Sequence, residues 1–417
     1  MFWNKTPSHK LNRKEFLTLT GAGLLSAALP TWVKRAVASM PQGSVDGKQV
    51  VVLFQRGAAD GLNIIPPYAD PLYRRSRPTI GLAEPGQKNG VIDLDGRFGL
   101  HPALASLKPM WDQKRFAVVH AAGSPDGTRS HFDAQDNMET GTPGIRSTQD
   151  GWLNRALLPF LDKSTSPLTA VSISPRLPRI LRGGFPVTSM NNIQSYKFLG
   201  GPEAQKSFEE MYQKNVDLVL SSAGKETADA VKMLQDVQMN DRGDKSAGSY
   251  QKNKISRDLY EVSRLIRSNV GLRVGFVEMG GWDHHANEGS ADGVLNQRLT
   301  ELGGAIASFY ESLGNRADDV LLVTMTEFGR TMEENGNRGT DHGHGSVMML
   351  FGGGIKGGKV YGRWPGLEKE NLNEGRDLEV TTDFRQVLSE IVGKQLAVKD
   401  LDKVFPRFKP GQSVGFV

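Results

Sequence analysis

Short apolar runs, each followed by a glycine-rich loop, constrain the fold of this chain more than any other feature. Strand-like runs cover residues 50–54, 116–119, 273–279, 320–325 and 347–351. Runs without alternating polarity are typical of strands that are covered on both faces, as in a parallel sheet. Helical periodicity at residues 293–313 separates the third run from the fourth. Strands that alternate with helices predict an α/β fold with a mostly parallel central sheet.

One stretch of the chain has a different character. Residues 203–268 are polar, poor in glycine and periodic, with a polar break at 240–249. Apolar residues recur there at helical spacing, among them Met211, Tyr212, Val231, Leu234 and Val237. The 417 residues suffice for one large domain or two ordinary ones. We predict a single domain over residues 39–417, with 203–268 as a helical insertion.

The N-terminal residues 1–38 have the features of an export signal. A basic segment precedes the weakly apolar stretch 17–29, and small residues at 36–38 form a typical cleavage site. Arg13 and Lys14 resemble the pair of a twin-arginine signal, with lysine in place of one arginine. We therefore expect recognition by export machinery and a periplasmic or secreted protein. A helical N-terminal arm is the alternative interpretation.

Charge and composition exclude several functions. The net charge of +5 is carried entirely by residues 1–38, so the remaining chain is formally neutral and offers nothing to drive nucleic-acid binding by counterion release. No apolar run reaches the roughly 20 residues of a membrane helix, so we expect no span in the mature chain. The absence of cysteine excludes disulfides, thiolate metal sites and a cysteine nucleophile.

Titratable side chains gather in the loops next to the predicted strands. These residues are Asp60, His131, Asp283, His285, Glu327, Arg330, Asp341, His342 and His344. In an open parallel sheet the carboxyl ends of the strands share one edge, where ligands bind. Loops that are far apart in sequence are therefore expected to converge there.

A cluster of carboxylates and imidazoles without matching cations is costly because of desolvation and repulsion. A bound divalent cation relieves that cost, so we predict a metal site. Mixed Asp, Glu and His ligation suits zinc, manganese or iron, whereas a carboxylate-rich set suits magnesium or calcium. Two cations about 4 Å apart could stabilise the attacking and leaving oxygens of an in-line displacement.

Several of these residues have ordinary structural alternatives. Asp60 precedes a glycine and could simply form a turn. Glu327 could be paired with Arg330 rather than with a metal. His101 precedes a proline and is expected to mark the start of a helix. His120, at the end of a strand, is as readily a buried hydrogen-bonded residue as a functional one.

Spacing distinguishes the remaining histidines. Asp283 and His285 are two apart, which lets both side chains face one way in extended backbone, whereas His284 points elsewhere and is expected to be structural. Residues 341–344 form the densest cluster, an Asp-His-Gly-His run that packing alone does not explain. Within this run, Asp341 and His342 are favoured as ligands over His344.

Ser130 has two competing interpretations. With Asp133 it fits a helix capping box, in which its hydroxyl only caps a helix. A helix N-terminus also favours anions, and a serine beside a metal could attack a phosphoryl or sulfuryl centre. Thr128 is an alternative nucleophile.

Five motifs carry a resemblance to known proteins. They are RGAADGLN at 56–63, SHFD at 130–133, GWDHHAN at 281–287, TEFGRT at 326–331 and DHG at 341–343. Together they resemble an uncharacterised secreted family, known as domain of unknown function 1501, whose members commonly carry twin-arginine signals. More loosely they resemble the alkaline phosphatase superfamily, which includes sulfatases. The resemblance extends over essentially the whole mature chain.

The wider resemblance implies a three-layer α/β/α fold with a two-metal centre. Asp60 would bridge the metals, Ser130 would attack, and Asp283 with His285 would hold one metal. The implied set is completed by Glu327, Asp341 and either His342 or His344.

Two departures from the superfamily pattern bear on this implied set. Phe328 follows Glu327 where the superfamily has a histidine, so one ligand position is lost unless Asp341 with His342, or His131, replaces it. Neither Ser124 nor Ser130 begins the sulfatase signature, which argues against a true sulfatase.

We therefore expect a secreted, metal-dependent hydrolase or transferase of phosphate-type esters, less readily of sulfate esters. The substrate would be a small-molecule or glycan ester, attacked by Ser130 or by a water that the metal activates. The alternative is a non-catalytic envelope protein that binds metal or glycan and retains the hydrolase fold.

Overall fold

The computed structural model of this chain describes residues 47–161, 166–197, 203, 206–207, 210–212, 218–240 and 253–417. The chain divides into two compact units, one formed by Met1–Gln42 and Tyr196–Asp236 and the other by Gly43–Ser195 and Val237–Val417. The predicted export signal at residues 1–38 lies outside the described residues, as do residues 241–249 of the predicted helix break.

The larger unit is built on a central sheet, whose strands lie in the order β10-β4-β9-β8-β1-β7-β5-β6, with β13 also paired to β4. Their bounds are β1 Gln49–Arg56, β4 Phe116–Gly123, β5 Ala170–Ile173, β6 Thr188–Met190, β7 Val274–Gly280, β8 Val320–Thr326, β9 Ser346–Gly352, β10 Lys359–Tyr361 and β13 Thr382–Asp383. β1 is central and pairs in parallel with both β7 and β8. All five predicted strands are present, and the expectation of a mostly parallel sheet is confirmed.

One strand breaks the parallel pattern. β9 runs antiparallel to both of its neighbours, β4 and β8. As a result, the residues that precede β9 lie at the same edge of the sheet as the residues that follow β1, β7 and β8. This reversal brings residues 341–345 to the edge where the other loops end.

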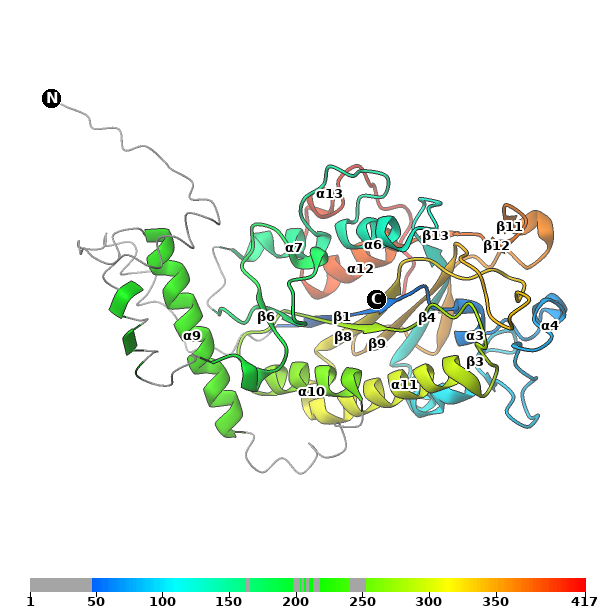
Figure 1. Cartoon of the computed structure of the whole chain (residues 1–417), viewed down its shortest axis with the longest axis horizontal. Coiled ribbons are helices and arrows are strands. Elements are labelled where there is room, and N and C mark those ends of the chain that lie inside the picture. Colours follow the sequence, from blue (N-terminus) through cyan, green and yellow to red (C-terminus); the bar gives the residue numbers. More distant parts are fainter. Residues whose placement is uncertain are drawn as a thin grey trace. The chain divides into compact units, whose positions relative to one another are not determined.

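Helices cover both faces of the sheet (Figure 1). One layer contains α10 (Lys254–Arg267) and α11 (Gly293–Leu313), which pack on each other. The other layer contains α6 (His131–Thr140), α7 (Trp152–Leu157), α12 (Phe384–Gln395) and α13 (Leu401–Val404). α11 has the bounds that its periodicity predicts. The mixed α/β fold is therefore confirmed, with three layers.

Every residue of β1 from Val50 to Phe54 is fully buried, because helices cover the strand on both faces. Val50, Val52 and Phe54 belong to the same hydrophobic core cluster as Val387 and Leu388 of α12. The uninterrupted apolar run is thus explained by burial on two sides.

The predicted helical stretch 203–268 contains α9 (Leu218–Asn240) and α10. In α9 the periodic residues Val231, Leu234 and Val237 are buried, as the spacing predicts. Shorter elements are α3 Gly61–Ile64, α4 Pro71–Ser76, α5 Lys108–Asp112, β2 Ile92–Asp93, β3 Gly99–Leu100, β11 Leu372–Asn373 and β12 Asp377–Leu378. Within the described part of the chain, no helix is both long and apolar enough to cross a lipid bilayer.

Candidate metal centre

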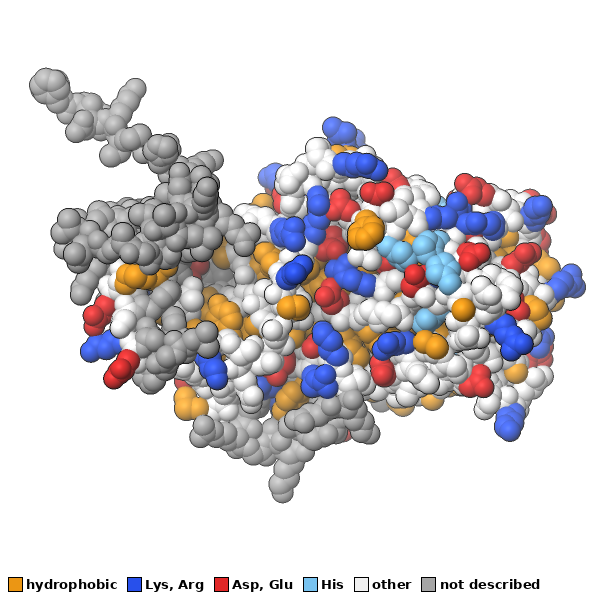
Figure 2. Space-filling view, in the orientation of Figure 1, with side chains coloured by type: hydrophobic (Ala, Val, Ile, Leu, Met, Phe, Trp, Pro, Cys, Tyr) orange, Lys and Arg blue, Asp and Glu red, His pale blue; other side chains and the backbone are white. Residues whose placement is uncertain are grey.

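Loops from five parts of the chain meet at the carboxyl edge of the sheet. They follow β1, precede α6, follow β7, follow β8 and precede β9. On the face shown in Figure 2, histidine side chains gather at one place on the surface, with acidic and basic side chains around them. The gathering of distant loops that the sequence predicts at this edge is therefore present for several of the candidate residues.

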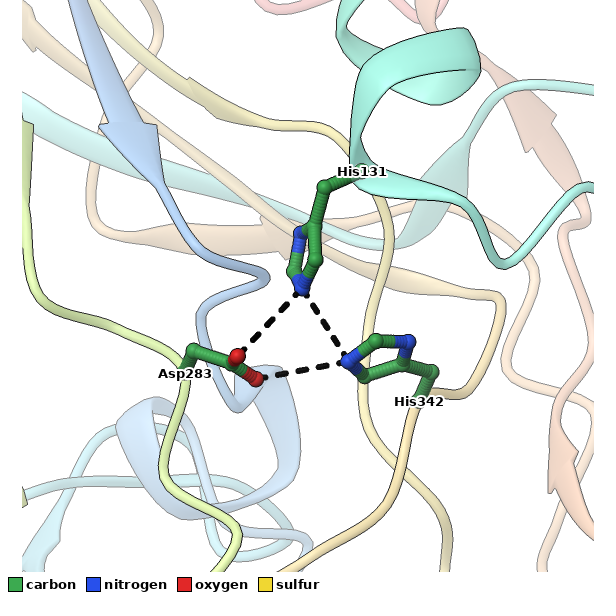
Figure 3. Close-up of side chains that lie close together, drawn as sticks. All are labelled: His131, Asp283 and His342. Atoms are coloured by element: carbon green, nitrogen blue, oxygen red, sulfur yellow. Dashed lines mark hydrogen bonds and ion pairs between the residues drawn. The ribbon is translucent and has the colours of Figure 1, made fainter.

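Three side chains form the centre of this group, and they point toward one another (Figure 3). His131, Asp283 and His342 each offer one ligand atom, and these atoms all lie within 4.8 Å of one another. Nε2 of His131 is 3.0 Å from Nε2 of His342. The Asp283 carboxylate is 3.3 Å from His342 Nε2 through Oδ1 and 3.5 Å from His131 Nε2 through Oδ2. We call these three residues the central triad.

His285 extends the central triad by a fourth donor. Its Nε2 atom is 3.0 Å from Oδ1 of Asp283 and 3.0 Å from Nε2 of His342. The side chains of Asp283 and His285 are 44% and 45% exposed, so the group is open to solvent. A small molecule can therefore reach it from outside.

The Nδ1 atom of each of the three histidines faces an oxygen. His131 Nδ1 is 2.8 Å from Oε1 of Glu327, and His342 Nδ1 is 2.9 Å from the Arg129 carbonyl oxygen. His285 Nδ1 lies 3.3 Å from Oδ1 of Asp341. Carbonyl and carboxylate oxygens only accept hydrogen bonds, so Nδ1 of His131 and Nδ1 of His342 each carry a hydrogen, and each of these rings, when neutral, has its lone pair on Nε2. His285 faces carboxylate oxygens through both of its ring nitrogens.

Two such lone pairs cannot hydrogen-bond to each other, so the 3.0 Å between His131 and His342 calls for a proton or a cation between them. Imidazole nitrogens whose far side is fixed by carboxylates or carbonyls are the usual ligands of zinc and related metals. The donor set of the central triad and His285 therefore fits a divalent cation.

Glu327 is buried behind His131. Its Oε1 accepts hydrogen bonds from the backbone of Gly57 and from the side chain of Gln135, in addition to His131. Burial alone would raise the pKa of Glu327, but these hydrogen bonds outweigh it and leave the pKa lowered. The hydrogen bond to Glu327 in turn raises the pKa of His131. Glu327 thus contacts the centre through His131.

The buried Arg330 binds the Asp283 carboxylate of the central triad. Its guanidinium is buried and donates to Oδ1 of Asp283 at 2.6 Å and to the carbonyl oxygen of Ala58 at 2.7 Å. Burial favours a higher pKa for Asp283, but the hydrogen bond and charge of Arg330 prevail and lower it. The prediction left Glu327 and Arg330 as a possible ion pair; the side chain that Arg330 contacts is Asp283.

Close backbone approaches hold these loops together. Arg330 and His342 form an antiparallel bridge, in which the Gly343 amide donates to the Gly329 carbonyl at 2.8 Å. A Cβ atom at Gly343 would lie 2.4 Å from the backbone of Arg330. Gly57 has a φ of +117°, and a Cβ there would lie 2.8 Å from the Asp283 amide nitrogen. Only glycine permits either approach.

Asp60, expected to bridge two metals, lies outside the central triad. Both of its carboxylate oxygens accept hydrogen bonds from the guanidinium of Arg77, and both side chains are buried. Burial would raise the pKa of Asp60, but Arg77 lowers it, whereas burial and the nearby Asp60 raise the pKa of Glu288 well above its usual value. Arg77 gave no signal in the sequence, because its pairing depends on a loop conformation that no pattern encodes.

Two further candidates lie at the periphery. His344 directs Nε2 to the carbonyl oxygen of Ser124 at 2.9 Å. The carboxylate of Asp341 accepts from Asn335 at 3.1 Å and faces His285. Asp341 therefore contacts the centre through His285, and His344 is bound to a backbone oxygen.

Ser130 is the N-cap residue of α6. Its hydroxyl accepts the backbone N–H of Asp133 at 3.5 Å, as in the capping interpretation. α6 begins with His131, which the sequence motifs indicated only as a possible replacement for a missing ligand. The position of His131 directly after the capping residue Ser130 could have identified it, because a helix that begins at this edge of the sheet places its first residue beside the loops that end there.

The other histidines lie in structural surroundings. His101 accepts the Ala103 amide at the start of a 3-10 helix, as expected of a helix boundary. His120 is buried, and its Nε2 atom lies 3.0 Å from the Ile65 carbonyl oxygen. His284 is buried with Nε2 2.9 Å from the Gly281 carbonyl oxygen, as predicted for a structural residue.

Three solved structures have some similarity to this chain, each at low identity and with a low TM-score. A protein in the alkaline phosphatase superfamily from Vibrio parahaemolyticus is 12% identical, with a TM-score of 0.35; the match covers 75% of this chain and 62% of that one, less than two thirds of its length. The sulfatase PsFucS1 from Pseudoalteromonas sp. is 12% identical, with a TM-score of 0.39 and coverage of 93% and 77%. The lipoteichoic acid synthase LtaP from Listeria monocytogenes is 10% identical, with a TM-score of 0.34 and coverage of 76% and 69%.

No curated protein matches the chain. Residues 47–405 match the profile of a family described as a protein of unknown function, DUF1501. That match covers the whole central sheet and every residue of the candidate metal centre. The chain therefore belongs to the DUF1501 family.

Proposed function

We propose that this chain is an exported, metal-dependent hydrolase or transferase of phosphate-type esters, and less readily of sulfate esters. The observation that carries the proposal is the convergence of His131, Asp283 and His342, with their ligand atoms within 4.8 Å of one another. The substrate would be a small-molecule or glycan ester, because the group is open to solvent.

The central triad and His285 would hold the cation. Zinc or manganese suits three imidazoles and one carboxylate better than calcium or magnesium does. Such a cation supplies Lewis-acid chemistry, drawing electron density from an ester oxygen. Glu327 and the Arg129 carbonyl fix the rings of His131 and His342, and Arg330 fixes Asp283.

The surroundings favour an anionic substrate. His131 is the first residue of α6, so the positive end of a ten-residue helix lies at the centre. Arg376, whose side chain is 46% exposed, donates to the carbonyl oxygen of His342 and also pairs with the buried Asp377 at 3.0 Å. These positive groups would attract a phosphate-type ester, and Ser130, at the same helix end, is the proposed attacking group.

A direct test measures turnover and metal content together. The purified mature chain is assayed on aryl phosphate monoesters, aryl phosphate diesters and aryl sulfates, before and after chelation, with elemental analysis of the same samples. We expect turnover of a phosphate ester that is lost with the metal and restored by zinc or manganese. Turnover that survives complete metal removal would refute the proposal.

A non-catalytic metal- or glycan-binding role is the second candidate. The capping contact of Ser130 favours it, because a hydroxyl engaged at a helix end does not need to be a nucleophile. The same measurements separate the two, since a binding protein would contain metal but turn over none of the esters.

Export is tested independently of chemistry. Arg13 belongs to the proposed twin-arginine pair, so Arg13→Ala should reduce the periplasmic yield of the chain several-fold relative to its total expression. Lys10→Ala, in the same basic segment, is a matched control that removes one charge outside the pair. An unchanged periplasmic fraction in Arg13→Ala would contradict the twin-arginine route.

A further inference from the structure

We propose that this centre takes a single divalent cation, and that two buried arginines supply fixed positive charge where a second cation would otherwise be needed. This inference rests on the proposed function and goes beyond it, because the motif resemblance implies two metals. It follows from how Glu327, Asp60 and Asp283 are already bound by other groups at this edge of the sheet.

The donors that are available point to one place. His342 Nε2 is 3.0 Å from Nε2 of His131 and 3.0 Å from Nε2 of His285. It is also 3.3 Å from Oδ1 of Asp283. His342 Nε2 is therefore the shared neighbour of the other three donors, and the ligand atoms of the central triad all lie within 4.8 Å of one another. One cation beside His342 would replace the contacts between lone pairs with bonds to metal.

Glu327 cannot serve a second cation while it holds His131. Its side chain has no exposed surface, and Oε1 accepts from three donors, Gly57, Gln135 and His131. Its other oxygen, Oε2, lies 3.1 Å from the Thr326 hydroxyl, which also lies 2.8 Å from the Gln55 carbonyl oxygen. Using Oε1 of Glu327 as a ligand would compete with the Gly57, Gln135 and His131 donors in a buried place, which is costly.

Asp60 is likewise occupied. Its two oxygens face the guanidinium of Arg77, which also donates to the Thr331 and Met332 carbonyl oxygens at 2.7 and 2.9 Å. Arg77 is 1% exposed and Asp60 2%. A cation at Asp60 would have to displace the Arg77 guanidinium from the Asp60 carboxylate. Because the guanidinium is buried, water could not replace the lost contacts, so Arg77 disfavours cation binding at Asp60.

Arg330 gives the second fixed charge. Arg330 is 1% exposed, and its guanidinium donates to Asp283 and to the backbone carbonyl oxygens of Ala58 and Trp282. These hydrogen bonds fix the Arg330 guanidinium in place, so it cannot move away when a cation binds. A second cation on the inner side of Asp283 would meet this charge at close range in a poorly solvated place, where repulsion is strong.

The stoichiometry of metal binding tests the inference without any assay of turnover. The full mature chain is stripped with chelator, then titrated calorimetrically with zinc chloride and, separately, with manganese chloride, and elemental analysis is made after gel filtration. We expect one cation per chain. Two cations per chain would overturn the inference and leave the proposed function standing, whereas none would overturn both.

Variants identify which carboxylates bind the cation. Asp283→Asn should abolish binding, whereas Glu327→Gln should keep one site with an affinity lower by about 10–100-fold, as for residues that orient a ligand. The double variant Asp60→Asn with Arg77→Met removes the buried pair together, so that neither charge is left alone. It should bind one cation with wild-type affinity.

The outcomes are unambiguous once folding is verified by circular dichroism. Loss of binding in the folded double variant would show Asp60 to be a ligand and overturn the inference. A folded Glu327→Gln chain that binds no cation at millimolar zinc would show that Glu327 is a ligand and would likewise overturn the inference. Retained binding in both variants, with loss in Asp283→Asn, supports a single-cation centre.

Discussion

His131 and His342 present their Nε2 atoms to each other at 3.0 Å while the Nδ1 atom of each ring faces an oxygen. If this arrangement is a metal site, His342→Asn and His131→Asn each remove one ligand nitrogen. We expect either variant to lose most of its bound zinc, measured by elemental analysis after dialysis against buffer with micromolar zinc. Circular dichroism should show an unchanged fold, because both side chains are partly exposed and neither belongs to the described hydrophobic core clusters.

His344→Asn is the matched control for this experiment. It removes an imidazole from the same loop, but its Nε2 is bound to the Ser124 carbonyl oxygen rather than directed at the central triad. The control should keep its zinc. Loss of zinc in His344→Asn alone, with retention in the other two variants, would contradict the assignment of His131 and His342.

The buried pair of Asp60 and Arg77 makes a prediction about stability. Asp60→Asn leaves a buried guanidinium without its carboxylate, so we expect a loss of about 3–5 kcal/mol in the free energy of unfolding. Glu288→Gln should cost less than Asp60→Asn, because burial raises the pKa of Glu288 well above its usual value and so favours the uncharged form that glutamine resembles. Urea denaturation at pH 7 measures both values.

The comparison is informative because the two carboxyl groups are neighbours in one buried network. Equal losses in the two variants would mean that Glu288 is ionised as well, contrary to the direction of its pKa. A larger loss in the free energy of unfolding for Glu288→Gln than for Asp60→Asn would mean that Glu288, rather than Asp60, is the charged partner of Arg77.

The core of the fold could be predicted because its signals are local. Residues 50–54 and 320–325 are uninterrupted apolar runs, which burial on both faces requires, and they form β1 and β8. The periodicity of 293–313 likewise fixes α11. β9 was located, but its reversed direction depends on pairing with β4 and β8, which no local pattern specifies.

The site was predictable in part for the same reason. Asp283, His285 and His342 lie in loops beside strands, and the shared edge of a sheet brings such loops together. Asp60 also lies in such a loop, yet Arg77, 17 residues later, binds its carboxylate. Residue type and spacing identify a possible ligand, but they do not show which partner it will face.

Two buried histidines predict a loss of stability in mild acid. Burial lowers the pKa of His101 and of His120 to about 4, from 6.5. Below pH 6.5 the unfolded chain therefore binds protons that the folded chain does not, and stability falls until pH 4. Each residue accounts for about 3 kcal/mol over this range. Urea denaturation at half-unit steps of pH measures it.

His120→Gln isolates one of these contributions. The glutamine amide can still donate to the Ile65 carbonyl oxygen, but it has no proton to gain. The variant should be less stable than the wild type at pH 7, and the gap should narrow by up to about 3 kcal/mol as pH falls to 4. Parallel stability curves for the two proteins would refute the lowered pKa of His120.

Ser130 is tested by substitutions that separate capping from catalysis. Its hydroxyl caps α6 by accepting the Asp133 amide, so Ser130→Ala should cost about 0.5–2 kcal/mol of stability. Ser130→Asp keeps a good cap but has no hydroxyl, so it should retain near wild-type stability. If Ser130 is the nucleophile, both variants lose ester turnover at least 100-fold at saturating metal, whereas Ser130→Thr, with a cap and a hydroxyl, keeps a measurable part of it. Turnover in Ser130→Asp close to that of the wild type would limit Ser130 to its structural role and favour a water molecule as the attacking group.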